Sequence, residues 1–511
     1  DEGDDLMFGG ADNDTFYAGA DNDEAYGGDG DDTIYGMDGD DTLYGGDGAD
    51  DIIGGADQDV IYGGAGDTVD GSETGVDNDT LIVDDVDYID YDSGNPENGT
   101  VYFNGGGTLT FTNIENVVVS DRDGTVSGTA GDDVIDGSYA GDPDGDFVDN
   151  DDAILAGDAA NDDLIEAGAG NDTIYAADGH DEIYAGTGDD AIYGGVGNDT
   201  VNGEAGDDTV FLTPDYDTDT IVGGETGETS GDILDGSALT TDQTLTFTGD
   251  EAGSVADDAN TGDPATDDIA TFSEIEGVVL GSGDDTIDTG AFAGSVASGA
   301  GDDTFIVNDG FGDATLNANE GGETTGDIID GSGLSDDVTV NFSAPEDGTI
   351  TDGTNTATFS DVERLNTGSG DDTITGSTGD ESIDSGAGND ILTGGAGNDT
   401  LSSGDGDDTF VVGDGDGSDT ITGGEGTETT GDTIDATSMT NDVTLQLNGD
   451  GQGYLFGSGD LTSFDEIENI DLGSGDDTVN ALSFGGTANV DTGAGNDSYS
   501  TGAGDDTATM G

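Results

Sequence analysis

An aspartate recurs every nine residues in the first part of the chain, each time after a cluster of glycines. The segments GGDGDDTIY (27–35) and GMDGDDTLY (36–44) show the pattern, with Asp32 and Asp41 at the sixth position of their repeats. Glycine adopts positive φ without strain, so such a loop can turn its carbonyls toward one point, to which the aspartate adds a carboxylate. These oxygen atoms suit a hard cation, and calcium, with about six to eight oxygen ligands, tolerates irregular geometry better than magnesium does. Softer metals lack ligands, because the chain has one histidine and no cysteine.

The last three residues of each nonapeptide have the pattern of a short β-strand. The eighth residue is apolar and points to one face, while the seventh and ninth point to the other. One such strand cannot bury its apolar side chain alone, but stacked strands can, which predicts a solenoid with a column of position-eight side chains such as Ile34, Leu43, Ile52 and Ile61. Because this core is thin, we expect cation binding to be coupled to folding.

The charge of the chain is extremely one-sided. There are 122 acidic residues and two basic ones, Arg122 and Arg364, which gives a formal net charge of −120. This balance disfavours nucleic acid and acidic membrane surfaces as partners and favours multivalent cations. A disordered acidic tail or a halophile's acidic surface would share the charge, but a disordered tail has no need of apolar residues at fixed intervals. No apolar run approaches the ~20 residues of a membrane span, so no membrane insertion is expected, and no classical signal peptide is visible.

Nonapeptide runs alternate with less regular stretches that resemble one another. These contain TFTNIENVVV (110–119), TFSEIEGVVL (271–280), TFSDVERLNT (358–367) and SFDEIENIDL (463–472), and period-two runs such as TLTFT (244–248). Both patterns are typical of strands, and no stretch shows helical periodicity with caps, so the sequence predicts an all-β protein. The expected organisation is nonapeptide blocks at 1–71, 128–212 with an insertion at 138–162, 281–307, 367–411 and 472–511, separated by β cassettes at 72–127, 213–280, 308–366 and 412–471.

The repeats resemble the repeats-in-toxin (RTX) calcium-binding nonapeptides, GGxGxDxUx, of secreted bacterial proteins. The resemblance implies a right-handed parallel β-roll with two nonapeptides per turn and many calcium ions held between successive loops. It also implies type I secretion through an uncleaved C-terminal signal, with folding delayed until the chain meets external calcium. The segment 128–176 further resembles parts of large secreted proteins of marine alphaproteobacteria. Because the chain begins and ends within repeats, we expect it to be part of a longer protein.

The resemblance assigns calcium binding to the position-six aspartates. In the first block these are Asp5, Asp14, Asp23, Asp32, Asp41, Asp50 and Asp59; in the second, Asp133, Asp172, Asp181, Asp190, Asp199 and Asp208; later in the chain, Asp285, Asp303, Asp372, Asp390, Asp399, Asp408, Asp477, Asp497 and Asp506. Two repeats depart from the pattern. Thr68 stands where aspartate is expected, with Asp67 beside it as a substitute, and Glu381 replaces aspartate in another repeat.

Aromatic side chains recur at position nine. With two repeats per turn, Tyr26, Tyr44 and Tyr62 should stack on one outer face, and Tyr17 and Tyr35 on the other. Such ladders can stabilise their own sheet by neighbour packing. An exposed aromatic stripe can also serve as a docking face for another module or subunit. The sequence leaves both interpretations open.

Catalytic classes find little support in the sequence. Without lysine or cysteine, a Walker loop, a Schiff base and a thiol nucleophile are excluded, and one histidine excludes an H-E-x-x-H metalloprotease site. We therefore expect a non-enzymatic, extracellular or cell-surface calcium-binding structural protein that self-associates into a surface layer, matrix or filament. The alternative is the secretion and folding region of a larger type I-secreted enzyme, toxin or adhesin. A soluble calcium buffer is a third reading.

Overall fold

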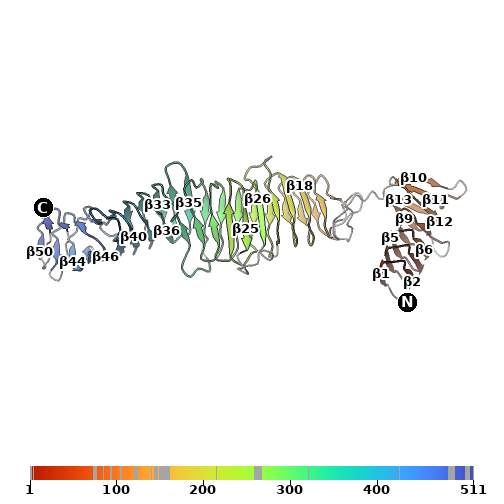
Figure 1. Ribbon diagram of the computed structural model, residues 1–511, viewed down its shortest axis with the longest axis horizontal. Coiled ribbons are helices and arrows are strands. Elements are labelled where there is room, and N and C mark those ends of the chain that lie inside the picture. Colours follow the sequence, from red (N-terminus) through yellow and green to blue (C-terminus); the bar gives the residue numbers. More distant parts are fainter. Residues whose placement is uncertain are drawn as a thin grey trace. The chain divides into compact units, whose positions relative to one another are not determined.

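The computed structural model describes the chain except for residues 1–2, 4, 73–77, 84–85, 92–94, 104–105, 120–124, 138, 140, 143–147, 149–160, 215, 258–267, 320, 425, 450, 458, 482–488, 501–506 and 510–511. The described residues form strands β1 to β51 and no helix, which confirms the all-β prediction (Figure 1). No helix in this part of the chain could therefore cross a membrane. The chain divides into two compact units, one built on residues 1–126 and one on residues 127–139 and 148–511.

In the first unit, successive nonapeptide strands alternate between two parallel sheets. One sheet has the order β1-β3-β5-β7-β9-β13 and the other contains β2, β4, β6 and β8. Paired residues lie two repeats apart, since Phe8 pairs with Tyr26 and Ile34 with Ile52. The chain therefore makes one turn per two nonapeptides and forms a parallel β-roll, as predicted. The strands are β1 (Leu6–Ala11), β2 (Thr15–Ala20), β3 (Glu24–Asp29), β4 (Thr33–Asp38), β5 (Thr42–Asp47), β6 (Asp51–Ala56), β7 (Val60–Tyr62), β8 (Thr68–Asp70) and β9 (Thr80–Val83).

The glycines of the loops are required by the close stacking of successive turns. Gly48 has a φ of +149°, and a Cβ atom there would lie 1.9 Å from the carbonyl oxygen of Gly30 in the preceding turn. Gly46, with a φ of +93°, would place a Cβ 2.2 Å from the carbonyl oxygen of Gly28. No side chain fits at either distance, so glycine at these positions sets the spacing of the turns.

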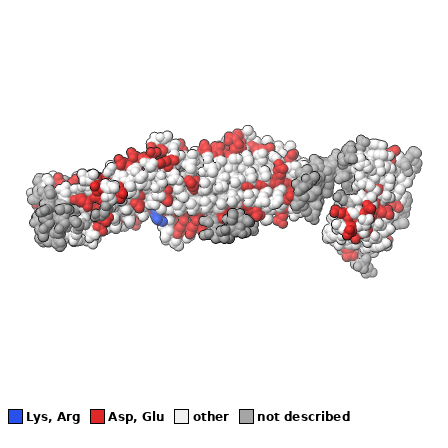
Figure 2. Space-filling model, in the orientation of Figure 1, with Lys and Arg blue, Asp and Glu red and all other residues white. Residues whose placement is uncertain are grey.

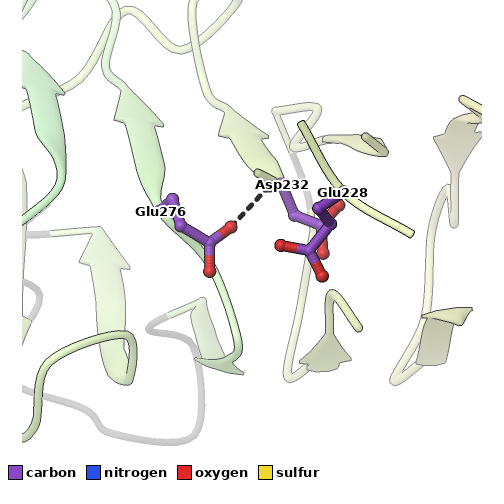
Figure 3. Close-up of side chains that lie close together, drawn as sticks. All are labelled: Glu228, Asp232 and Glu276. Carbon is purple, nitrogen blue, oxygen red and sulfur yellow. Dashed lines mark hydrogen bonds between the residues drawn. The ribbon is translucent and has the colours of Figure 1, made fainter. Parts of the chain in front are cut away.

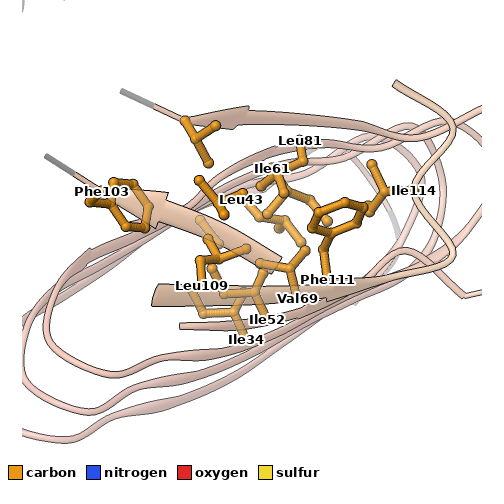
Figure 4. Packing of buried hydrophobic residues seen from close by; sticks show 13 residues of the cluster. Ile34, Leu43, Ile52, Ile61, Val69, Leu81, Phe103, Leu109, Phe111 and Ile114 are labelled. Atoms are coloured by element: carbon orange, nitrogen blue, oxygen red, sulfur yellow. The ribbon is translucent and has the colours of Figure 1, made fainter. Parts of the chain in front are cut away.

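The core of the first unit is the column of position-eight side chains. Ile34, Leu43, Ile52 and Ile61 are completely buried, and they pack in line between the two sheets (Figure 4). The column continues through Val69 and Leu81 to a group of side chains from the following cassette. That group comprises Val101, Phe103, Leu109, Phe111 and Ile114.

The cassette at the end of the first unit adds antiparallel strands to the same sheets. Strands β10 (Val86–Tyr91), β11 (Gly99–Phe103) and β12 (Thr108–Thr112) pair in sequence order, and β12 then pairs in parallel with β8. Strand β13 (Asn116–Val119) pairs in parallel with β9 of the opposite sheet. The cassette thus covers the end of the core column with apolar side chains.

The second unit contains two long sheets, one with strands from β16 (Leu164–Glu166) to β50 (Ser498–Ser500) and one with strands from β15 (Val134–Ile135) to β51 (Thr507–Thr509). Most of their strands are three residues long, like β17 (Thr173–Tyr175). Three antiparallel triplets interrupt the parallel order: β24 (Gln243–Phe247), β25 (Gly253–Asp257) and β26 (Ile269–Ser273); β33 (Thr339–Ala344), β34 (Asp347–Thr351) and β35 (Thr356–Ser360); and β44 (Thr444–Gly449), β45 (Gln452–Gly457) and β46 (Asp460–Asp465). Each triplet belongs to the sheet of its neighbours, so strand pairing continues through the cassettes. Most of the insertion at 138–162 lies outside the described residues.

The related stretches of the cassettes, read from sequence as strand-like, each contain two strands and a corner. In TFSEIEGVVL, β26 ends at Ser273 and β27 (Gly277–Val279) begins in the opposite sheet. Glu274 between them has a φ of +59°, in the left-handed region, and Ile275 after it is fully buried. The same corner occurs at Asn113, Asp361 and Glu466, with φ between +56° and +57°. The corner brings the residue two positions later, a glutamate in all four stretches, to the loop side of the roll.

Candidate metal sites

The position-six aspartates form ladders in which each carboxylate accepts a hydrogen bond from the turn before it. The amide N–H of Asp14 donates to Oδ1 of Asp32 at 2.7 Å, and the amide of Asp23 donates to Oδ1 of Asp41 at 2.8 Å. The bond recurs in the second unit, for example from Asp190 to Asp208 and from Asp285 to Asp303. Because the strands stack at one turn per two repeats, each ladder follows one edge of the roll.

The second oxygen of these carboxylates points into the loops. A Cβ atom on Gly27 would lie 2.5 Å from Oδ2 of Asp32 and 2.3 Å from the carbonyl oxygen of Gly45. The side chain missing at Gly27 therefore leaves a space onto which a carboxylate oxygen and a backbone carbonyl converge. Gly36 repeats the arrangement with Asp41 and Gly54.

Many of these Oδ2 atoms are buried without a hydrogen-bond partner. They include those of Asp23, Asp32, Asp41, Asp172, Asp190, Asp199, Asp208, Asp285, Asp303, Asp372, Asp390, Asp399, Asp408 and Asp477. A buried anionic oxygen without a donor is costly unless a cation neutralises it. The donor set consists of carboxylate and carbonyl oxygens, which fits calcium. When bound, the ion would supply the positive charge that the chain itself lacks.

The structure places almost all of the sequence-predicted aspartates in these ladders. Asp23, Asp32, Asp41, Asp50, Asp59, Asp172, Asp181, Asp190, Asp199, Asp208, Asp285, Asp303, Asp372, Asp390, Asp399, Asp408 and Asp477 are buried. Asp5, Asp14, Asp133 and Asp497 are partly buried and also take part in ladder hydrogen bonds. Asp506 lies outside the described residues.

The two repeats that depart from the pattern both take part in the ladder, although the Glu381 carboxylate accepts from the Ser377 hydroxyl and not from an amide of the preceding turn. Asp67 accepts the amide hydrogen bond of Asp50 at 2.9 Å, so it takes the place that a count of nine gives to Thr68. Glu381 is buried, and its amide donates to Oδ1 of Asp399 at 2.9 Å.

Further ladder residues were missed by counting nine residues along the sequence. Asp79, Asp163, Asp219, Asp232, Asp327, Asp419 and Asp432 are all buried at ladder positions, mostly after loops of unusual length. One signal would have found them: each stands two residues before a buried aliphatic side chain, as Asp232 stands before Leu234 and Asp32 before Ile34. The spacing to the core is fixed by the strand, whereas the loop length is not.

Four glutamates extend the ladders at the cassettes. Oε2 of Glu115 accepts from the amide of Asp79 at 2.7 Å, and Oε2 of Glu276 accepts from the amide of Asp232 at 2.5 Å. Glu363 and Glu468 accept in the same way from Asp327 and Asp432. Each of these glutamates stands two residues after one of the left-handed corner residues described above. The sequence showed their recurrence but not their role.

Position five forms a second, exposed ladder that runs in the opposite direction. The amide of Asp40 donates to Oδ1 of Asn22 at 3.1 Å, so the later residue donates and the earlier one accepts. His180 joins this ladder, since its Nδ1 accepts from the amide of Asn198 at 2.8 Å. Its presence in a calcium-type repeat is therefore explained by a backbone contact.

Burial and neighbouring carboxylates raise the pKa of several ladder acids above that of ordinary aspartic acid. Burial, followed by the charge of Asp23 and Asp40, raises the pKa of Asp41 to about 6. Burial raises the pKa values of Asp208 and Asp285 to about 7, again with neighbouring aspartates contributing. Without a cation these groups hold protons near neutral pH, and a bound cation would have to replace them.

Position-nine aromatic rings stack along the outer faces of the first unit as predicted. Ring centroids lie 4.3 Å apart between Tyr26 and Tyr44 and between Tyr44 and Tyr62, and 4.9 Å apart between Tyr17 and Tyr35. The Tyr26 hydroxyl donates to Oε1 of Glu24 at 2.6 Å. The rings therefore pack on one another within their own sheet, which supports the stabilising interpretation.

The stacked loops, carboxylate ladders and aliphatic column define a calcium-binding β-roll protein. The profile of the RTX calcium-binding nonapeptide repeat matches residues 1–34, 26–61, 35–70, 119–140, 157–192, 175–210, 184–218, 358–392, 386–417, 414–429 and 489–508. The chain belongs to the proteins that carry RTX repeats. Such repeats bind calcium, and proteins that contain them are typically secreted by bacteria. A search of curated proteins found no match.

Proposed function

We propose that this chain is an extracellular structural scaffold whose folding and assembly depend on calcium. The observation that carries the proposal is the continuity of the second unit, where both sheets run through three cassettes without a break in strand pairing. A solenoid extended in this way is suited to mechanical or spacing roles, because each turn contacts only its neighbours and length can grow without a larger core. The proposal assigns no catalytic role to the chain.

The charge of the surface supports a calcium-dependent assembly. Asp and Glu are spread over the face shown in Figure 2, and Arg364 is the only basic residue among the described ones. Copies of such a surface repel one another until cations reduce the charge. We therefore expect self-association only when calcium is present.

The test is the state of the purified chain before and after addition of millimolar calcium. Light scattering and electron microscopy should show ordered assemblies with calcium, and these should dissolve when a chelator is added. Monodisperse monomers in calcium would contradict the scaffold proposal. They would favour the alternative, a secretion and folding region of a larger type I-secreted enzyme, toxin or adhesin, which the RTX repeats alone support equally well.

A further inference from the structure

Three loops of the second unit are longer than the nonapeptide loop and carry a glutamate that the repeat does not. The first lies between β22 (Thr220–Val222) and β23 (Ile233–Asp235) and reads GGETGETSGD, with Glu228 four residues before the ladder residue Asp232. The second, before β32 (Ile328–Asp330), contains Glu323 and Asp327 at the same spacing. The third, before β43 (Thr433–Asp435), contains Glu428 and Asp432.

A carboxylate from the preceding turn fixes the shape of each long loop. Oδ1 of Asp207 accepts from the amides of Thr229, Ser230 and Gly231 at 2.7, 2.9 and 3.1 Å. These bonds lower the pKa of Asp207 to about 2. Asp302 and Asp407 hold the second and third loops through the equivalent amides. Asp207 thus fixes the backbone of the loop directly after Glu228.

Three carboxylates meet at the first loop. Oxygen atoms of Glu228, Asp232 and Glu276 all lie within 4.8 Å of one another, and Figure 3 shows the side chains of Glu228 and Asp232 side by side with Glu276 facing them. Glu276 comes from the corner of the following cassette, 44 residues after Asp232. Glu323, Asp327 and Glu363 meet within the same distance at the second loop.

The buried oxygens of these clusters lack protein donors. Asp232 is 1% exposed and Asp327 is fully buried, and their Oδ2 atoms have no hydrogen-bond partner. Oε1 of Glu228 is likewise buried without one. A Cβ on Gly231 would lie 2.4 Å from Oε2 of Glu276, so the loop leaves just enough room for the glutamate. Three carboxylates at this separation repel one another unless a cation or a proton lies between them, and the chain offers no side-chain cation of its own apart from two arginines.

We propose that the clusters Glu228–Asp232–Glu276 and Glu323–Asp327–Glu363 each bind a calcium ion at a second class of site, built from glutamates outside the nonapeptide repeat. At the third loop the same residue types recur in Glu428 and Asp432 of the loop and Glu468 of the following corner, and the amide of Asp432 donates to Oε2 of Glu468 at 2.9 Å. Each site joins a long loop to the corner of the cassette that follows it. The inference is independent of the scaffold proposal, since it concerns binding by a single chain.

The test compares calcium binding by the full chain and by the double variant Glu228→Gln/Glu323→Gln. Glutamine keeps the size of each side chain but removes its charge, so we expect two fewer calcium ions per chain after equilibrium dialysis. Hydrogen exchange of residues 225–235 and 321–330 should then require more calcium for protection than in the wild type, while residues 367–411 should be unchanged. The matched control is Glu225→Gln, an exposed glutamate of the first loop that lies outside the cluster.

An unchanged ion count and unchanged local protection would overturn the proposal. The competing arrangement is a proton shared among the carboxylates, and burial together with the neighbouring acids raises the pKa of Asp232 to about 8. In that case, protection of the loops would follow pH and not calcium. A second measurement needs no variant: in wild-type crystals grown with Tb³⁺, anomalous density is expected between Glu228 and Glu276, and density confined to the ladder loops would contradict the assignment.

Discussion

The amide N–H of Asp23 donates a 2.8 Å hydrogen bond to Oδ1 of Asp41, the equivalent residue one turn later. The bond ties adjacent turns together and at the same time holds the carboxyl group of Asp41 away from water. Since Oδ2 of Asp41 has no protein partner, the same contact that builds the roll also prepares a place for a cation.

Rising pH should destabilise the metal-free fold and stabilise the calcium-loaded one. The pKa values of Asp41, Asp208 and Asp285, raised by burial to about 6, 7 and 7, exceed the value of about 4 in an unfolded chain. At pH values between the unfolded and the folded pKa, the folded state binds more protons than the unfolded state. The free energy of unfolding therefore falls as pH rises through this range. Calcium replaces the protons and removes this loss. Denaturant midpoints in chelator and in calcium, at about pH 5 and about pH 8, check the sign. Equal midpoints in chelator at both pH values would contradict it.

Replacing Asp41 by asparagine should weaken calcium binding while leaving the ladder hydrogen bond in place. Asparagine keeps an oxygen for the Asp23 amide but loses the anionic charge, so we expect a loss of about tenfold in affinity, or ~1.4 kcal/mol, at that site. Isothermal titration calorimetry of the variant measures it. Asp31→Asn is the control, because Asp31 is exposed and accepts hydrogen bonds from the Ala49 amide and from Nδ2 of Asn13, outside the position-six ladder. A similar loss of calcium affinity in both variants would mean that the overall negative charge of the chain governs binding, and not the particular site.

Gly46→Ala should damage the roll far more than Gly10→Ala. Both glycines have positive φ, +93° and +95°, so both variants incur strain of about 1–3 kcal/mol. Only at Gly46 does the new Cβ meet a backbone oxygen, at 2.2 Å from Gly28, whereas Gly10 has open space. Circular dichroism with thermal unfolding in calcium measures the difference, and equal effects would show that turn spacing is adjustable.

Leu43→Ala should cost ~2–5 kcal/mol of unfolding free energy in calcium, because it empties part of a column that is completely buried. Leu6→Ala is the control, since Leu6 is 58% exposed and its truncation should change stability by less than about 0.5 kcal/mol. Urea unfolding followed by circular dichroism gives both values. Tolerance of Leu43→Ala would imply that calcium alone holds the turns.

Replacing Tyr26, Tyr44 and Tyr62 together by serine distinguishes the two roles of the aromatic ladder. If the stacked rings only stabilise their own sheet, the melting temperature falls and assembly in calcium is retained at temperatures where the variant is folded. If the stripe also docks another copy, assembly weakens while the roll remains. Light scattering beside circular dichroism separates these results.

The regular part of the fold could be predicted from the sequence because one rule repeats. The nine-residue period places Ile34, Leu43, Ile52 and Ile61 in the core and Asp32 and Asp41 in the ladders. The period fails where the loop changes length, as before Asp232, since the strand and not the loop fixes which residue reaches the ladder. The role of Glu276 depends on the left-handed corner at Glu274, which brings together residues 44 positions apart. Nothing in the sequence around Asp232 indicates that its partner lies 44 residues later.

The opposed directions of the two side-chain ladders give the roll a polarity. At position six the earlier turn donates and the later turn accepts, as from Asp14 to Asp32, whereas at position five the later turn donates, as from Asp40 to Asn22. A turn at one end of such a roll therefore lacks the partners that a turn at the other end offers. Copies that stack end to end and continue both ladders would do so head to tail, which produces open filaments or rings.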